Sequence, residues 1–167
     1  MQVHHRYASV EGRQLFYREA GASDAPAVVL LHGYPTSSFM FRNLIRMLAD
    51  RYHVIAPDYL GFGQSDSPTV DEFDYSYDSL ARVTAELLNQ LGVERYAIYV
   101  QDYGAPIGWR LALLPTAPVT AIISQNGNGY EAGFVPDFWN PIWSYGDTPN
   151  PQTESALRPG LALEAIV

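Results

Sequence analysis

Residues 100–104, with the sequence VQDYG, have the residue types and the spacing of a nucleophile carried on a sharp turn. They follow an apolar stretch of strand length and lead into a segment with helical periodicity, with Gly104 two positions after Asp102. This is the spacing of a nucleophile elbow, which exposes a reactive side chain on a strained strand-to-helix turn. A carboxylate there can attack an electrophilic carbon directly and form an ester. The sequence therefore predicts Asp102 as a nucleophile, and the simplest alternative is that Asp102 is only a helix N-cap.

A second loop, residues 32–35 with the sequence HGYP, follows another apolar stretch and favours the catalytic interpretation. In enzymes with a nucleophile elbow, one backbone N–H of the oxyanion hole comes from such a loop and the other from the residue after the nucleophile. These donors would be the N–H groups of Tyr34 and Tyr103. We interpret His32 as a hydrogen-bonded structural residue, because it lies too early in the chain to be the base of a triad.

A third loop, residues 58–66 with the sequence DYLGFGQSD, contains Asp58 and the glycine pair Gly61 and Gly63. We interpret this loop as a tight structural turn rather than as a site. The residues that we assign to the structural motif, and not to the chemistry, are His32, Gly33, Pro35, Asp58, Gly61, Gly63 and Gly104.

Strands and helices alternate in the hydrophobic pattern around these loops. Strands are predicted at residues 6–10, 14–18, 27–31, 52–56, 96–100 and 119–124. The first two are separated by a turn-like tripeptide, which predicts a hairpin. Apolar residues recur at helical spacing from Phe41 to Leu48, from Leu80 to Leu91 and from Ile107 to Leu114. This alternation implies an α/β fold with a doubly wound, mostly parallel sheet and helices on both faces. The three loops would then meet at the carboxyl ends of the strands, where such sheets bind ligands.

The amino-acid composition changes after residue 125. Proline, glycine and aromatic residues become frequent, and the aromatic side chains need a place to be buried. We interpret residues 1–128 as the core unit and residues 129–167 as the start of a cap, or lid, over the sheet edge. Residues 153–167 are predicted to be helical, with an interruption at Pro159 and Gly160.

Composition excludes several classes of protein. The chain has 167 residues, no Cys and a net charge of −8, so it lacks the basic surface of a nucleic-acid binder and any thiolate nucleophile. No apolar run is long enough to span a membrane, and we expect a cytoplasmic protein that needs neither metal nor cofactor. Residues 119–124 are expected at an edge of the sheet, where an exposed apolar strand favours self-association.

The three loops together resemble the α/β-hydrolase superfamily, and the Asp at the elbow resembles its epoxide hydrolase and haloalkane dehalogenase branch. The matching segments are residues 31–35, 58–66 and 100–104, which occur in the family order. The resemblance implies a small-molecule substrate and a two-step reaction without a cofactor. Asp102 would open an epoxide or displace a halide by attack on carbon, and a His-activated water would then hydrolyse the ester.

Within this branch the residues leave both substrate classes open. In the dehalogenases that the chain resembles, a Trp usually follows the nucleophile and its indole N–H binds halide. This chain has Tyr103 at that position. One dehalogenase subgroup places its catalytic acid where this chain has Asn126, which can at most donate a hydrogen bond. Epoxide hydrolases use cap tyrosines as donors, and Tyr130 and Tyr145 lie in the cap segment, where we expect them mainly to pack. Tyr103, Asn126 and Trp139 are our candidates for contacts to substrate.

One part of the expected machinery is missing from the sequence. A triad on this fold runs in the order nucleophile, acid, histidine. The four histidines all precede Asp102 and are His4, His5, His32 and His53. We therefore expect the catalytic acid, the catalytic histidine and the last strands to lie outside this chain, and the chain to be inactive alone. The alternative is a non-catalytic or degenerate hydrolase-fold protein, or a gene fragment.

Overall fold

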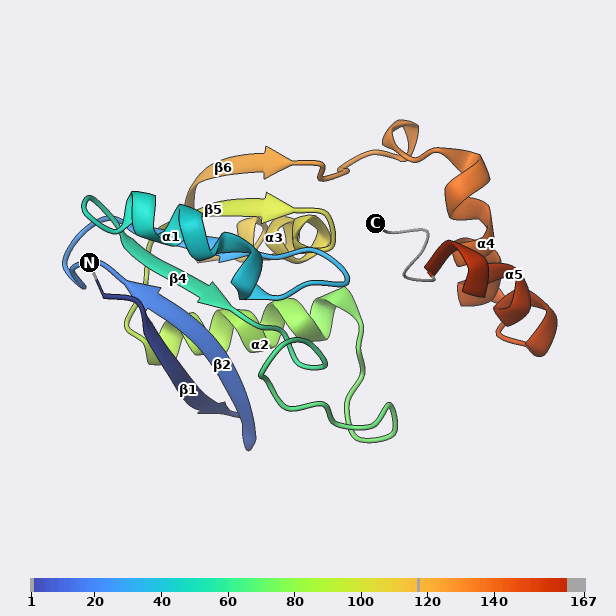
Figure 1. Cartoon of the computed structure of the whole chain (residues 1–167), viewed down its shortest axis with the longest axis horizontal. Helices are drawn as coiled ribbons and strands as arrows, with labels where there is room; N and C mark the ends of the chain where they lie inside the picture. The colour runs from blue at the N-terminus through green and yellow to red at the C-terminus, as the bar shows by residue number, and fades with distance from the viewer. Residues whose placement is uncertain (1, 117, 162–167) are drawn as a thin grey trace. The chain divides into compact units, whose positions relative to one another are not determined.

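A computed structural model describes residues 2–116 and 118–161, and the chain forms two compact units, residues 1–127 and 128–167 (Figure 1). The strands of the first unit are β1 (His4–Val10), β2 (Arg13–Ala20), β3 (Ala27–Leu31), β4 (His53–Pro57), β5 (Tyr96–Gln101) and β6 (Val119–Gln125). Its helices are the short 3₁₀ helix η1 (Ser38–Phe41), α1 (Arg42–Leu48), α2 (Tyr77–Gln90) and α3 (Gly104–Ala112). The second unit contains η2 (Glu131–Gly133), α4 (Pro136–Asp147) and α5 (Pro151–Leu161).

The six strands form one sheet in the order β1-β2-β4-β3-β5-β6. The β1–β2 hairpin and the β2–β4 pair are antiparallel, and β3, β4, β5 and β6 pair in parallel. The predicted hairpin and the predicted, mostly parallel sheet are therefore confirmed. In this order β3 and β5 lie inside the sheet, so the loops that follow them leave neighbouring strand ends.

Alternate residues of β3 belong to two different cores. Val29 and Leu31 pack in the core beneath α2 and α3, whereas Val28 and Leu30 pack in the core beneath α1. The strand is buried on both faces, which explains why its sequence is a continuous apolar run instead of an alternating one. The predicted helices on both faces are confirmed.

The helix boundaries follow local signals with one exception. Ser37 accepts a hydrogen bond from the N–H of Phe39 at the start of η1, and Gly92, with a φ of 72°, follows the end of α2. The apolar spacing predicts that the third helix reaches Leu114, but α3 ends at Ala112. No helix among the described residues is long and apolar enough to cross a membrane.

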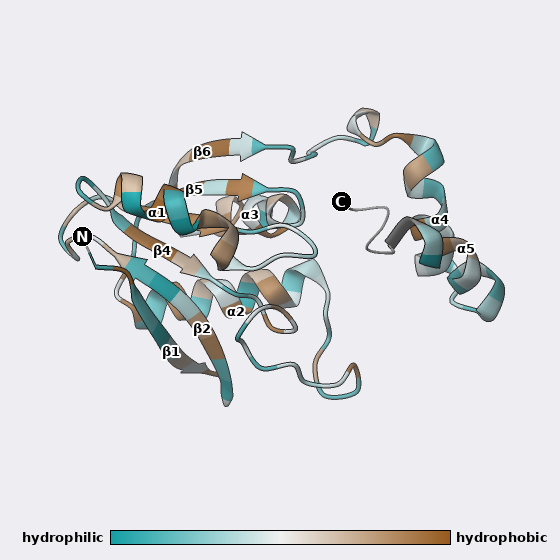
Figure 2. Cartoon of the chain, in the orientation of Figure 1, coloured by the Kyte–Doolittle hydropathy of each residue, from teal (hydrophilic) through white to brown (hydrophobic). Residues whose placement is uncertain are grey.

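The two edges of the sheet differ in character. Strand β1 is exposed at most of its residues and is largely hydrophilic, shown in teal in Figure 2. Strand β6 has no charged residue, and its Ile122 and Ile123 are 47% and 50% exposed. Among the described residues β6 pairs only with β5, so the prediction that it lies at an edge is confirmed for this part of the chain.

The second unit is helical, and residues 128–159 include no buried side chain. Its aromatic rings contact one another, with Trp139 at 4.7 Å from Phe134 and 6.3 Å from Trp143 between ring centroids. The predicted interruption at Pro159 is wrong, because α5 continues through this residue to Leu161. Pro159 has no N–H, so α5 lacks the one hydrogen bond from position 159 to the carbonyl of Ser155, yet the helix continues past it. Residues 162–167 of the predicted helix lie outside the described residues.

Candidate active site

Asp102 lies at the turn between β5 and α3, as predicted. Its φ is 49°, a left-handed conformation that costs energy for a residue with a side chain and that often marks a functional turn. Its carbonyl accepts a hydrogen bond from the N–H of Ala105 at 2.9 Å, which starts the first turn of α3. The strand, the sharp turn and the helix of a nucleophile elbow are therefore all present around this carboxylate.

The carboxylate of Asp102 is held by the second loop. The backbone N–H of Tyr34 donates a hydrogen bond to Oδ1 of Asp102 at 2.8 Å. Gly33 makes this approach possible, since a Cβ on Gly33 would lie 2.7 Å from the Cβ of Asp102. Oδ2 of Asp102 accepts no hydrogen bond from the residues that the structure describes, so one oxygen is fixed and the other is free to react.

Gly104 brings the elbow against the end of β3. A Cβ at Gly104 would lie 2.3 Å from the carbonyl oxygen of Leu31, and backbone atoms cannot yield such space. Only glycine therefore lets α3 begin this close to the strand. This contact explains the small residue two positions after Asp102.

Asp58 ties the third loop to η1, the short helix that follows the second loop. Its side chain is buried, and it accepts hydrogen bonds from the N–H of Ser38 at 2.7 Å and from the N–H of Gln64 at 2.9 Å. Gly63, with a φ of 56°, allows this turn, because a Cβ there would lie 1.9 Å from Oδ2 of Asp58. Both oxygens of the Asp58 carboxylate therefore accept structural hydrogen bonds, and neither is free to react.

His32 is fully buried below the loops. Its Nδ1 lies 3.0 Å from the carbonyl oxygen of Gly33, and its Nε2 lies 3.4 Å from the backbone nitrogen of Tyr59. The tautomer that carries the proton on Nδ1 satisfies both contacts, because Nδ1 then donates and Nε2 accepts. Burial lowers the pKa of His32, so the ring stays neutral at pH 7. These contacts fit the structural interpretation of this histidine.

Phe62, on the third loop, is a residue that the sequence analysis did not single out. Its half-buried ring contacts the ring of Tyr34 at 6.3 Å and the ring of Tyr103 at 5.5 Å between centroids. It also contacts His32 at 5.4 Å and Tyr59 at 6.1 Å. An aromatic residue between two glycines was the only sequence signal, and periodicity carries no information about such a loop position.

The ring of Tyr103 is supported on another side by α2. Tyr77, the first residue of α2, contacts it at 4.8 Å between centroids. Burial raises the pKa of Tyr77 to about 12, helped by the nearby Tyr103 and Asp102, so its phenol stays protonated at neutral pH. Arg110 of α3 lies 5.5 Å from the centroid of the Tyr77 ring.

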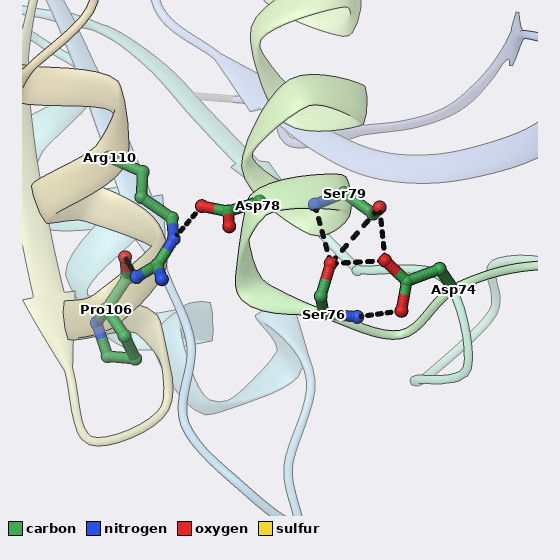
Figure 3. Close-up of polar contacts among 6 residues, drawn as sticks. All are labelled: Asp74, Ser76, Asp78, Ser79, Pro106 and Arg110. Carbon is green, nitrogen blue, oxygen red and sulfur yellow. Dashed lines mark hydrogen bonds and ion pairs between the residues drawn. The ribbon is translucent and has the colours of Figure 1, made fainter.

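Figure 3 shows how the start of α2 is anchored. Arg110 reaches from α3 to form an ion pair with Asp78 of α2, and also donates to the carbonyl of Pro106 at 3.0 Å. At the first turn of α2, the Ser76 hydroxyl accepts a hydrogen bond from the N–H of Ser79 at 3.2 Å. These contacts fix α2 against α3, the helix that begins beside the elbow.

The comparisons with known proteins agree with this geometry. Residues 26–154 match the family model described as alpha/beta hydrolase fold. The chain belongs to the α/β-hydrolase fold family. Among curated proteins, this hydrolase chain is 47% identical over 141 residues to "Uncharacterized hydrolase YNR064C" of Saccharomyces cerevisiae, over 84% of this chain and 48% of that protein. It is 39% identical over 120 residues to haloalkane dehalogenase 2 of Mycobacterium tuberculosis, over 72% of this chain and 40% of that protein.

Solved structures give the same family relations. Haloalkane dehalogenase DbeA from Bradyrhizobium elkani aligns with a TM-score of 0.69 and 34% identity, over 74% of this chain and 41% of that chain. Epoxide hydrolase A from Mycobacterium thermoresistibile aligns with a TM-score of 0.68 and 35% identity, over 74% of this chain and 39% of that chain. The chain therefore spans about half the length, or less, of these relatives.

Two of the three predicted substrate contacts lie away from the elbow in sequence. Asn126 follows β6 in the first unit with a φ of 51° and is exposed. Trp139 lies on α4 of the second unit, where it contacts Phe134, Phe138 and Trp143. Tyr103 is the predicted contact whose ring packs with the Phe62 ring of the third loop and with Tyr77. No group of three or more His, Asp or Glu side chains in the described part of the chain is placed to hold a metal ion.

Proposed function

We propose that this chain carries the nucleophile of a hydrolase that works through an alkyl ester on Asp102, with a haloalkane or an epoxide as substrate. The observation that carries the proposal is the Asp102 carboxylate, held by the Tyr34 N–H through Oδ1 on a turn with a φ of 49°. A side chain that served only as a helix cap would not need this conformation or this second loop. The relatives named as a haloalkane dehalogenase and an epoxide hydrolase supply the two substrate classes.

The first step follows from the two oxygens of the carboxylate. Oδ2 of Asp102 forms a bond to the electrophilic carbon, while the hydrogen bond to Tyr34 keeps Oδ1 in place. With a haloalkane, the carbon–halogen bond breaks and the halide leaves with the electron pair. With an epoxide, a carbon–oxygen bond breaks and the alkoxide takes a proton from water or from an acidic group. Asp102 acts directly, so this step needs no base.

The second step is hydrolysis of the ester. Water adds to the carbonyl carbon of the ester as a base takes one of its protons, and we assign the Tyr34 and Tyr103 N–H groups to the oxyanion that forms. When the oxyanion collapses, the bond from this carbon to the alcohol oxygen breaks, the alcohol leaves with that proton, and the Asp102 carboxylate is restored. A general base that accepts a proton from this water is worth roughly 10²–10⁴-fold in rate. The sequence has no histidine after Asp102, and His32 is buried with both ring nitrogens occupied. We infer that the ester accumulates on this chain and that the acid and histidine that complete the reaction lie outside it.

Covalent labelling tests this proposal directly. The 167-residue chain is incubated with a reactive alkyl bromide or with styrene oxide, and intact mass and peptide mapping follow. We expect one adduct on Asp102, no adduct in Asp102→Asn, and a normal adduct in the control Asp24→Asn, which changes an exposed carboxylate. Labelling that persists in Asp102→Asn, with the amide shown intact, would assign the nucleophile to another residue. Steady multiple turnover by the chain would contradict the missing base, and a folded chain that never labels would favour a non-catalytic hydrolase-fold protein.

We also propose that the chain associates with itself through β6. Among the described residues no strand pairs with its outer edge, the strand has no charged residue and no proline, and Ile122 and Ile123 are about half exposed. Native edges usually carry such blocking residues, because an open edge pairs with other strands. Sedimentation should show concentration-dependent association that Ile123→Arg weakens, while the same change at the exposed Leu113 leaves it intact. A monomer at all concentrations would refute this proposal.

A further inference from the structure

We infer that Phe62 is a positioning residue. It holds the second loop, which carries Tyr34, in a fixed place relative to the elbow, so that the Asp102 carboxylate is aligned for attack. This inference rests on the proposed function and assigns a role to the third loop, which the reaction does not otherwise use. The two residues whose rings contact Phe62 at 6.3 and 5.5 Å, Tyr34 and Tyr103, are the same two whose N–H groups we assign to the oxyanion.

The contacts of Phe62 link segments that are far apart in the sequence. Tyr34 follows β3, Phe62 follows β4 and Tyr103 follows β5, so three strand ends are joined by side chains of one kind. The Phe62 ring meets the Tyr34 ring at an interplanar angle of 89°, an edge-to-face contact. Each aromatic pair of this type contributes stability beyond simple burial, and its angular preference restricts how the two loops can shift.

Two members of this row of rings, Phe62 and Tyr103, have anchors of their own. The third loop, which carries Phe62, is anchored by Asp58, which accepts hydrogen bonds from Ser38 of η1 and from Gln64. Tyr103 is held by Tyr77, whose ring lies beneath Arg110 at 5.5 Å. A ring at position 62, on an anchored loop and beside the anchored Tyr103, can transmit that rigidity to the N–H of Tyr34, which bonds the reacting carboxylate.

The experiment compares two phenylalanines of the same stretch of chain. Phe62→Leu removes the ring between Tyr34 and Tyr103, whereas Phe73→Leu removes a more buried ring that contacts Tyr75 and Arg13 instead. Single-turnover labelling of Asp102 gives a rate constant at saturation, a half-saturating concentration and an amplitude. A merely structural change lowers the amplitude, because fewer molecules are folded, but leaves the rate constant of the folded ones unchanged.

We expect Phe62→Leu to lower the saturating rate constant about tenfold, because a displacement of about 1 Å can cost up to 10²-fold. The half-saturating concentration should change little, and Phe62→Tyr, which keeps the ring, should restore the rate. Phe73→Leu should keep the wild-type rate constant at a lower amplitude. A wild-type rate constant in Phe62→Leu, or an equal loss in Phe73→Leu, would overturn the inference.

Amide hydrogen exchange separates this inference from the proposed function. The N–H of Tyr34 donates to Asp102, so its protection reports the alignment without any reaction. We expect Phe62→Leu to reduce this protection several-fold and Phe73→Leu to leave it unchanged relative to global stability. If the wild type never labels, the proposed function fails, and the exchange result still decides the role of Phe62. Phe62→Met, which fills similar volume without a ring, replaces Phe62→Leu if that variant does not fold.

Discussion

The aromatic rings of the two units differ in how far they are buried. In residues 1–127 the rings of His32, Tyr59 and Phe62 pack against each other beside a core whose central side chains are inaccessible. In residues 128–167, Phe138 and Trp143 contact neighbouring rings but remain 53% and 42% exposed. The first unit therefore has a core of its own, while the second has surface contacts only. Stability and the proposed chemistry should both reside in the first unit.

The largest effect should come from a buried carboxylate of the first unit. Asp58→Ala removes the acceptor of the buried N–H of Ser38 and of the partly buried N–H of Gln64, and a buried donor left unpaired costs about 1–3 kcal/mol. We expect the free energy of unfolding to fall by about 3–5 kcal/mol in urea titrations followed by circular dichroism. Asp137→Ala, on the exposed face of α4, should change it by less than about 0.5 kcal/mol. Similar losses in both variants would show that the two units do not differ in this way.

The sequence predicted the regular elements because burial leaves a pattern along the chain, periodic in the helices and continuous in a strand that is covered on both faces. Residues 27–31 are apolar at every position, and the structure buries this strand between two cores. The elbow could also be predicted. The carbonyl of Leu31 leaves room only for glycine at position 104, and this glycine is visible in the sequence. Both predictions depend on neighbours along the chain or on a residue type that a single contact dictates.

The contacts across loops could not be predicted in the same way. Asp58 and Phe62 act on partners at positions 38, 34 and 103, and no local pattern encodes which distant groups a loop side chain will meet. The helix α5 shows the opposite failure, because a local rule about Pro159 predicted an interruption that the structure lacks. Substrate contacts by Asn126 and Trp139 stay predictions.

A smaller effect should appear in the pH dependence of the first unit. Burial lowers the pKa of His32 below its ordinary value of 6.5, so the unfolded chain binds a proton that the folded chain does not. Stability is therefore full above pH 6.5 and is lost as the pH falls from 6.5 towards the lowered pKa, by at most about 1.4 kcal/mol per pH unit. Urea titrations at pH 7, 6 and 5 should show a shallower slope for His32→Gln than for the wild type. Parallel slopes would mean that the buried ring takes no part in acid sensitivity.

The smallest effect should follow from removing the second unit altogether. Both hydrophobic cores, as the structure describes them, consist of residues that precede β6 or belong to its start, and residues 128–159 contribute no buried side chain. A chain that ends at residue 127 should unfold within about 0.5 kcal/mol of the wild type, because none of its core contacts is lost. A chain that ends at residue 118 also loses β6, which pairs with β5 from Tyr96 to Gln101, and it should be several kcal/mol less stable. If the two truncations cost the same, β6 adds nothing to the sheet. If the truncation at residue 127 alone lowers the free energy of unfolding by more than about 1 kcal/mol, the first unit is not stable by itself, as its packing indicates it should be.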